Sequence, residues 1–262
     1  MLEPSIIFVL IIVASFFAYK HHSLTGTGAY AALIVGMAVF IGFGVKGLFL
    51  LGVFFATSSF WSKFKSLEKR NIEEKLAKGS IRDWRQVAAN GGAAALFSII
   101  YFLNNDDLWL IAFAVSIASA NSDTWASEIG TLSKRKPFSI RTFQRMEKGT
   151  SGAVSLLGSC AAILGAFLIS LFCFWLFQLN VSDSIIIFLF GFIGNMIDTL
   201  FGAFYQQLYV CKKCGIETEK QFHCHLETQR IKGFRFVDND MVNFLSGLLA
   251  AFAALGIVYI IN

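Results

Sequence analysis

The chain has 262 residues, of which 56% are apolar, and a mean hydropathy of +0.64. These values exclude an ordinary soluble domain and are typical of a membrane protein with several spans. The net charge is +5, and the five cysteines do not have the pattern of a disulfide framework.

The apolar residues occur in continuous runs rather than in the alternating pattern of a membrane β-barrel, so we expect an all-α fold. Most runs approach the roughly 20 residues that a membrane helix needs. The sequence predicts a polytopic bundle of about eight transmembrane helices that forms a single integral membrane domain over residues 1–262. The expected helices fall at about 3–19, 27–43, 46–62, 90–103, 108–128, 151–178, 184–209 and 241–261.

Basic residues concentrate in long loops at about 63–89, 131–150 and 211–240, whereas the opposite loops are short and neutral or acidic. The positive-inside rule therefore predicts that the long loops are cytoplasmic and that both termini lie outside. We expect the protein in a bacterial or archaeal cell membrane. The basic loops can simply reflect topology and attraction to anionic lipid, or they can attract an anionic ligand from the cytoplasm.

Two carboxylates, Asp123 and Glu128, close the apolar run that begins at Leu108. An ionised acid at the centre of a membrane helix costs roughly 2.5–3.5 kcal/mol on insertion scales, so it normally faces a cavity or a partner. The residues between them, which include Ser127, are mostly small or hydroxylic. We interpret the pair as a metal or phosphate site at a helix end. The alternative is an acid pair that reaches out to the interface.

The next long helix is expected from about residue 151, and its start is the hydroxyl-rich segment Lys148-Gly149-Thr150-Ser151-Gly152-Ala153-Val154-Ser155. Free backbone amides and the helix dipole favour an anion at such a start, and Lys148 and Arg141 can add charged donors. We expect a phosphate seat here. An ordinary capped membrane helix is the alternative, since the GxxxxGK motif is absent.

Two further acids are expected at the same membrane face. Asp198 follows Gly191 and Gly194 at three- and four-residue steps, which places it on a face that packs closely inside the bundle. Asp240 and Asn243 open the last helix, where acids are also common as capping groups.

The last loop holds a CxxC pair, Cys211 and Cys214, followed by His223-Cys224-His225. Four such nitrogen and sulfur ligands can bind structural zinc, and we name Cys211, Cys214, His223 and Cys224 as the candidates. Adjacent ligands rarely both reach one ion, so reduced thiols without a metal are the alternative.

Several motifs together resemble the integral membrane family of transmembrane protein 19 and the plant phytyl-phosphate kinase. They are NSDTWASEIG at 121–130, EKGTSGAVS at 147–155, DTLFGA at 198–203, DNDMVNF at 238–244 and WRQVAANGG at 84–92. A fainter likeness links Asp123, Gly130 and Lys148-Gly149-Thr150 to the dolichol and phytol kinases, which resemble CTP-dependent enzymes. One departure is Ser151-Gly152-Ala153, where the family pattern has Asn-Gly-Gly.

The resemblance implies a membrane kinase that converts a prenyl monophosphate, such as phytyl or geranylgeranyl phosphate, to the diphosphate. The donor is a nucleoside triphosphate, with CTP favoured, and no nucleic-acid partner is expected. The rival interpretation is a membrane transporter or lipid scramblase, which would also explain acids within the bundle. Its site should lie near the midplane, whereas these motifs gather at one face.

We expect Mg²⁺ at the acids, although Mg²⁺ usually takes only one or two carboxylates. The expected metal ligands are Asp123, Glu128, Asp198 and Asp240, and the expected catalytic residues are Asp123, Glu128, Asp198 and Lys148. The expected nucleotide and substrate contacts are Asn121, Ser127, Arg141, Gly149, Thr150, Gly152, Ser155, Asn239 and Asn243.

Overall fold

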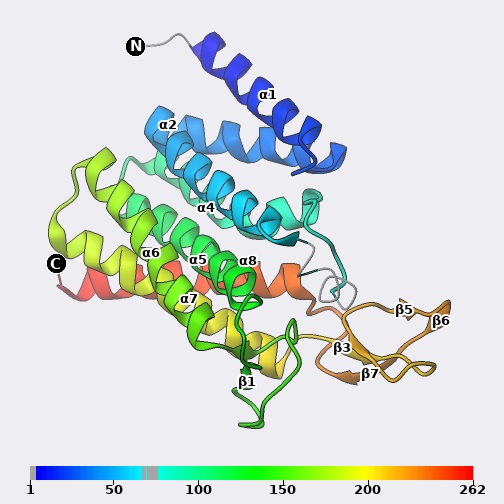
Figure 1. Ribbon diagram of the computed structural model, residues 1–262. Coiled ribbons are helices and arrows are strands. Elements are labelled where there is room, and N and C mark those ends of the chain that lie inside the picture. Colours follow the sequence, from blue (N-terminus) through cyan, green and yellow to red (C-terminus); the bar gives the residue numbers. More distant parts are fainter. Residues whose placement is uncertain (1–3, 67–68, 70–75, 262) are drawn as a thin grey trace.

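The computed structural model describes residues 4–66, 69 and 76–261. Its helices pack into one bundle, with α1 at the edge against α2 (Figure 1). The helices are α1 (Pro4–Lys20), α2 (Gly26–Lys63), α4 (Trp84–Asn104), α5 (Leu108–Gly130), α6 (Leu156–Phe177), α7 (Val181–Phe204) and α8 (Asn239–Ile261).

The helical lengths support an integral membrane bundle. Within the described ranges, five helices are long and apolar enough to cross a membrane, namely α2, α4, α6, α7 and α8. The expected helices at 27–43 and 46–62 are confirmed as two helical segments within α2, which are joined across a sharp break at Gly44 with φ 60° and ψ −149°. Glycine adopts that conformation far more readily than other residues. The five candidate spans among the described residues do not confirm eight transmembrane helices.

Helix α5 lies at the centre of the bundle, in contact with α2, α4, α6, α7 and α8. Its residues from Leu110 to Ser119 are all buried, as expected for a helix that is apolar all round. The acid Asp123 thus projects from the most enclosed helix of the bundle.

The fold is mostly helical rather than all-α, because the long loops contain short antiparallel strands. Pairing in these strands satisfies backbone groups that an irregular loop would leave to water. Strand β3 (Leu208–Val210) lies between β4 (Glu217–Thr218) and β7 (Gln229–Lys232), and two further pairs are β1 (Phe138–Ser139) with β2 (Ala153–Val154) and β5 (Phe222–His223) with β6 (Leu226–Glu227). Elements of two to four residues carry too little alternation to be recognised in the sequence.

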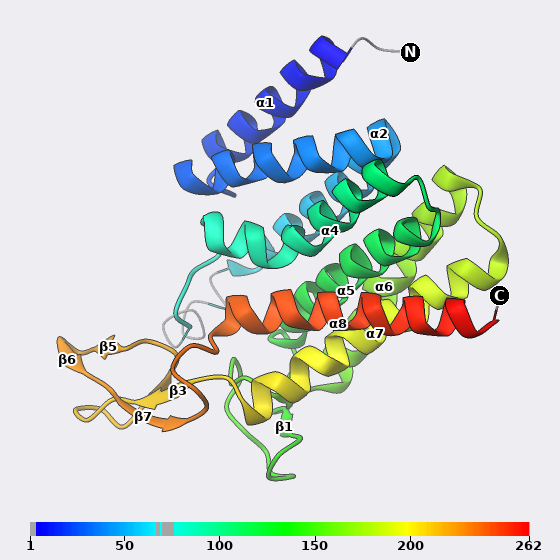
Figure 2. The ribbon, with the colours of Figure 1, turned by 180° about the vertical axis from the view of Figure 1, so that it is seen from behind.

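The long loops meet at one end of the bundle, and both termini lie at the other end (Figures 1 and 2). We call the first the loop end and define it by residues 76–83, 131–155 and 205–238. The shared position of these loops brings together segments that are far apart in the sequence.

Candidate functional site

A polar cavity of about 340 Å³ opens at the loop end. It is lined by the ends of the helices and by the loops between them. Most of the site residues expected from the sequence contribute to its wall: Asp123, Ser127, Glu128, Lys148, Gly149, Thr150, Gly152, Ser155, Asp198, Asn239, Asp240 and Asn243.

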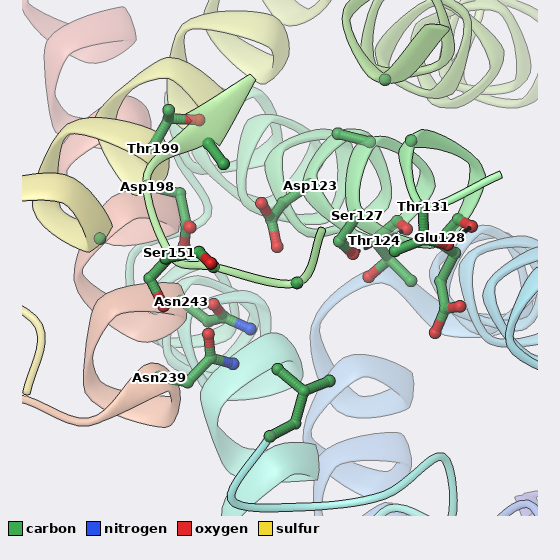
Figure 3. A pocket seen from close by; sticks show the side chains of 18 of the residues that line it. Asp123, Thr124, Ser127, Glu128, Thr131, Ser151, Asp198, Thr199, Asn239 and Asn243 are labelled. Carbon is green, nitrogen blue, oxygen red and sulfur yellow. Dashed lines mark hydrogen bonds between the residues drawn. The ribbon is translucent and has the colours of Figure 1, made fainter. Parts of the chain in front are cut away.

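Close packing of α5 against α7 positions the two acids at the base of this cavity. A Cβ atom added at Gly194 would lie 2.1 Å from Ser119 Oγ, so only glycine lets the helices approach this closely. Asp123 and Asp198 each follow one helical turn after that contact. Their carboxyl groups consequently face each other across the cavity (Figure 3).

Polar side chains surround the facing pair. The carboxyl groups of Asp123 and Asp198 lie close enough to influence each other's charge. Asp198 also accepts a hydrogen bond from Ser246 Oγ at 3.3 Å. The side-chain amide of Asn243 satisfies its hydrogen bonds when its nitrogen faces Asp198, and in that orientation it donates to Asp198 at 3.0 Å. Two carboxylates this close and enclosed need a proton or a cation between them. Oxygen ligands of this kind suit Mg²⁺.

The other two acids expected to bind metal have cationic partners of their own. Glu128 accepts from Ser62 Oγ and from Lys69 Nζ, each at 2.7 Å. Asp240 forms an ion pair with Lys78 at 2.5 Å. Figure 3 shows the Glu128 side chain directed away from the facing aspartates. The structure thus separates the four acids expected at one Mg²⁺ site, and only Asp123 and Asp198 are arranged to share an ion.

The expected phosphate seat is a turn in front of α6 rather than the first turn of the helix. The helix begins at Leu156, and the side chain of Ser155 caps it by accepting from the Gly158 amide at 3.0 Å. Gly149 and Gly152 both have φ of 80°. A Cβ at Gly152 would lie 2.4 Å from Ala203 Cα, so glycine is needed there for the loop to lie against α7.

Two residues expected at the site lie elsewhere. Asn121 is fully buried, donates to the Gly165 carbonyl at 2.8 Å and accepts from Thr57 at 3.1 Å, so it links α5 to α6 and α2. It precedes Asp123 by two residues, which turns it about 200° around the helix and away from the cavity. Arg141 is exposed and outside the cavity wall. Neither side chain contributes to the cavity wall, and their roles as substrate contacts stay predictions.

The sequence reasoning missed Glu219, which enters the cavity wall from the loop between β4 and β5. Its carboxylate accepts from Ser151 Oγ at 2.9 Å, from Gln206 Nε2 at 2.8 Å and from the Ala77 amide at 3.3 Å. Burial raises the pKa of Glu219, and these hydrogen bonds oppose the shift. This one side chain joins three loops over the cavity. In the sequence it lies close to another acid, Glu217, in a charged loop, and nothing there indicates that it is buried.

Three cations of the cavity wall were also missed, namely Lys69, Lys78 and Arg82. Arg82 donates to Ser59 Oγ at 2.8 Å, and burial lowers the pKa of its guanidinium while the charge of Glu128 opposes that shift. Lys78 pairs with Asp240 and also lines the cavity. The cavity therefore combines a pair of facing carboxylates with cationic side chains, an arrangement that can bind a divalent cation and phosphate together.

The four candidate zinc ligands lie outside the cavity wall. Cys211, Cys214, His223 and Cys224 gather among the strands of the last loop, with their ligand atoms within 4.8 Å of one another.

Comparison with known proteins gives a family match over most of the chain. The family described as integral membrane protein DUF92 matches residues 9–251. An uncharacterized membrane protein of Methanocaldococcus jannaschii is 36% identical over 76% of this chain and 82% of its own. In Arabidopsis thaliana, Protein PGR is 30% identical over 97% of both chains, and the chloroplastic Protein VTE6 is 27% identical over 88% of this chain and 64% of its own. No solved structure matches.

Proposed function

The chain belongs to the integral membrane family DUF92, and we propose that it is a prenyl-phosphate kinase that acts at the loop end. The observation that carries this proposal is the facing pair Asp123 and Asp198 at the base of a polar cavity with cationic walls. The substrate class comes from the resemblance of the motifs to the plant phytyl-phosphate kinase. Use of CTP, and a cytoplasmic position of the loop end, are part of the proposal.

In this proposal Asp123 and Asp198 hold Mg²⁺, and Asn243 keeps Asp198 in position by donating a hydrogen bond to it. When bound there, Mg²⁺ neutralises phosphate charge and orients the phosphates for transfer. The two carboxylates fit this role because Mg²⁺ usually takes one or two carboxylates and completes its coordination with water and phosphate oxygens.

The remaining wall of the cavity suits phosphate. Lys148 and the hydroxyl of Thr150 lie in the glycine-flanked loop, and Arg82 and Lys78 add positive charge to the cavity wall. The cavity opens at the ends of helices that are apolar enough to cross a membrane. A prenyl phosphate can therefore place its head group in the cavity and its chain between the helices, in contact with lipid.

The transfer needs positioning more than proton abstraction. An oxygen of the prenyl phosphate attacks the γ-phosphorus of the nucleotide and forms a new P–O bond. The bond between that phosphorus and the bridging oxygen breaks, and the nucleoside diphosphate leaves with the electron pair. A monophosphate at neutral pH is already an anionic nucleophile, so no strong general base is required. Alignment and charge neutralisation supply the catalysis.

Transfer of labelled phosphate tests the proposal. Purified protein with Mg²⁺ would be incubated with CTP or ATP labelled at the γ-phosphate and with phytyl, geranylgeranyl or longer prenyl monophosphates. Formation of labelled prenyl diphosphate is expected. Folded protein that forms no product with any pair of substrates, but moves prenyl phosphate between membrane leaflets, would replace the kinase with the transporter or scramblase.

A further inference from the structure

The last loop folds into a small unit that the proposed transfer reaction does not explain. We call residues 208–232, which contain β3 to β7, the strand module. Two tight turns in it carry the cysteines and histidines. In the first turn the Gly215 amide donates to the Cys211 carbonyl at 2.8 Å, and Gly215 has a φ of 73°. This turn brings Cys214 back beside Cys211.

The second turn has an unfavourable backbone for its residues. His223 and Leu226 pair across the β5–β6 hairpin, so Cys224 and His225 form a two-residue turn. Both have positive φ, 52° and 62°. A hairpin turn with two left-handed residues normally contains Asn or Gly. Side chains held in that conformation need surroundings that fix them, and a shared ligand is one such constraint.

The same turn explains how neighbouring residues can face one point. Cys224 Sγ lies 3.8 Å from Cys214 Sγ, and His223 Nδ1 lies 3.3 Å from Cys224 Sγ and 3.5 Å from Cys214 Sγ. A tetrahedral zinc ion with Zn–S distances of about 2.3 Å has S–S separations of about 3.8 Å. A disulfide would require an S–S distance of about 2.05 Å. The spacing therefore matches a shared metal ion.

We propose that Cys211, Cys214, His223 and Cys224 bind one zinc ion and that this ion holds the strand module over the cavity. Four protein ligands complete a tetrahedral site and leave no open position for a reaction, which is typical of structural zinc. None of these four zinc-binding residues lines the cavity. Glu219, however, lies in the chain between the two turns and contacts Ser151 and Gln206 at the cavity wall. The ion thus fixes the segment that carries Glu219.

Metal content of the purified full chain is the first test. Protein prepared in detergent without chelator should contain about one zinc ion per chain. Cys214→Ser and His223→Ala should each lose it. The matched controls are Cys160→Ser, a cysteine outside the module, and His225→Ala, the histidine next to the proposed ligands; both should retain it. Zinc-free wild-type protein, or a Cys214–Cys224 disulfide in it, would overturn the site.

Two measurements on the wild-type chain avoid variants that fail to fold. Replacement of zinc by Co²⁺ should give the intense thiolate-to-cobalt absorption of a site with several sulfur ligands, and absorption typical of oxygen ligands alone would overturn the assignment. Removal of zinc by a chelator should speed amide exchange in residues 205–232, and unchanged exchange would overturn the holding role. These readings use no nucleotide or prenyl lipid, so they are independent of the proposed kinase activity.

Discussion

Replacement of Gly194 by alanine tests whether the approach of α5 and α7 creates the facing aspartates. The added Cβ would lie 2.1 Å from Ser119 Oγ and 2.5 Å from Ser119 Cβ. Because Ser119 is buried, the helices must separate to relieve the overlap. Overpacking of this kind costs typically 1–3 kcal/mol of unfolding free energy.

The functional effect should exceed the loss of stability. The overlap lies one turn before Asp123 and Asp198, and a displacement of about 1 Å at reacting groups can lower a rate by roughly 100-fold. We expect Gly194→Ala to lower both the melting temperature in detergent and the rate of prenyl diphosphate formation. The assay would compare equal amounts of folded protein, so that a lower rate cannot result from a smaller amount of folded enzyme.

The chain offers a matched control and a rescue. Gly256 is also a membrane-helix glycine, but a Cβ there meets nothing within 4 Å. Gly256→Ala should therefore stay active and gain up to about 1 kcal/mol from helix propensity. Adding Ser119→Gly to Gly194→Ala removes the clashing side chain and should restore part of the activity. Equal stability and activity of Gly194→Ala and Gly256→Ala would refute the packing argument.

Three further predictions concern buried polar groups of the loop end and its helices. Asn121→Ala should lower the unfolding free energy by about 1–3 kcal/mol, since it removes the buried hydrogen bonds of Asn121 with the Gly165 carbonyl and Thr57, while folded protein keeps its prenyl phosphate affinity in a binding assay. Glu128→Ala should lower the unfolding free energy by about 3–5 kcal/mol, because it leaves the charge of the buried Lys69 without its partner. Thermal melting should show this loss in Glu128→Ala, and no comparable loss in Asp123→Asn. The pKa of Glu219 is raised in the folded state, so the unfolding free energy should fall as the pH rises above 4.5, the ordinary pKa of a glutamate. Glu219→Gln should make the melting temperature depend less steeply on pH, and an unchanged dependence would contradict the assignment.

The sequence predicted the membrane bundle, and it singled out four acids that include Asp123 and Asp198, because these signals are local. Long apolar runs indicate membrane helices wherever they occur, and an acid such as Asp123 or Asp198 within such a run stands out by its cost. Glycines at helical steps before Asp198 also indicated the close packing that the structure contains.

The features that were missed depend on how distant segments meet. Glu219 is buried and Arg82 is half-buried only because loops fold back over the cavity, and no residue beside them in the chain indicates it. The metal prediction used four acids that share a membrane face, but the sequence could not show that Lys69 and Lys78 pair with two of them. The adjacency of His223 and Cys224 weakened the zinc prediction, because the left-handed turn that lets both side chains converge is not readable from spacing.

The measurement that most directly tests the central claim compares the acid pair in one phosphate-transfer assay. Wild-type protein would be assayed beside Asp123→Asn, Asp198→Asn and Asp107→Asn. Asp107 lies at the opposite end of α5, is exposed and caps the helix with no side-chain hydrogen bond. Labelled prenyl diphosphate is expected from wild-type protein and Asp107→Asn only. Product at the wild-type rate from Asp123→Asn or Asp198→Asn would contradict the central claim.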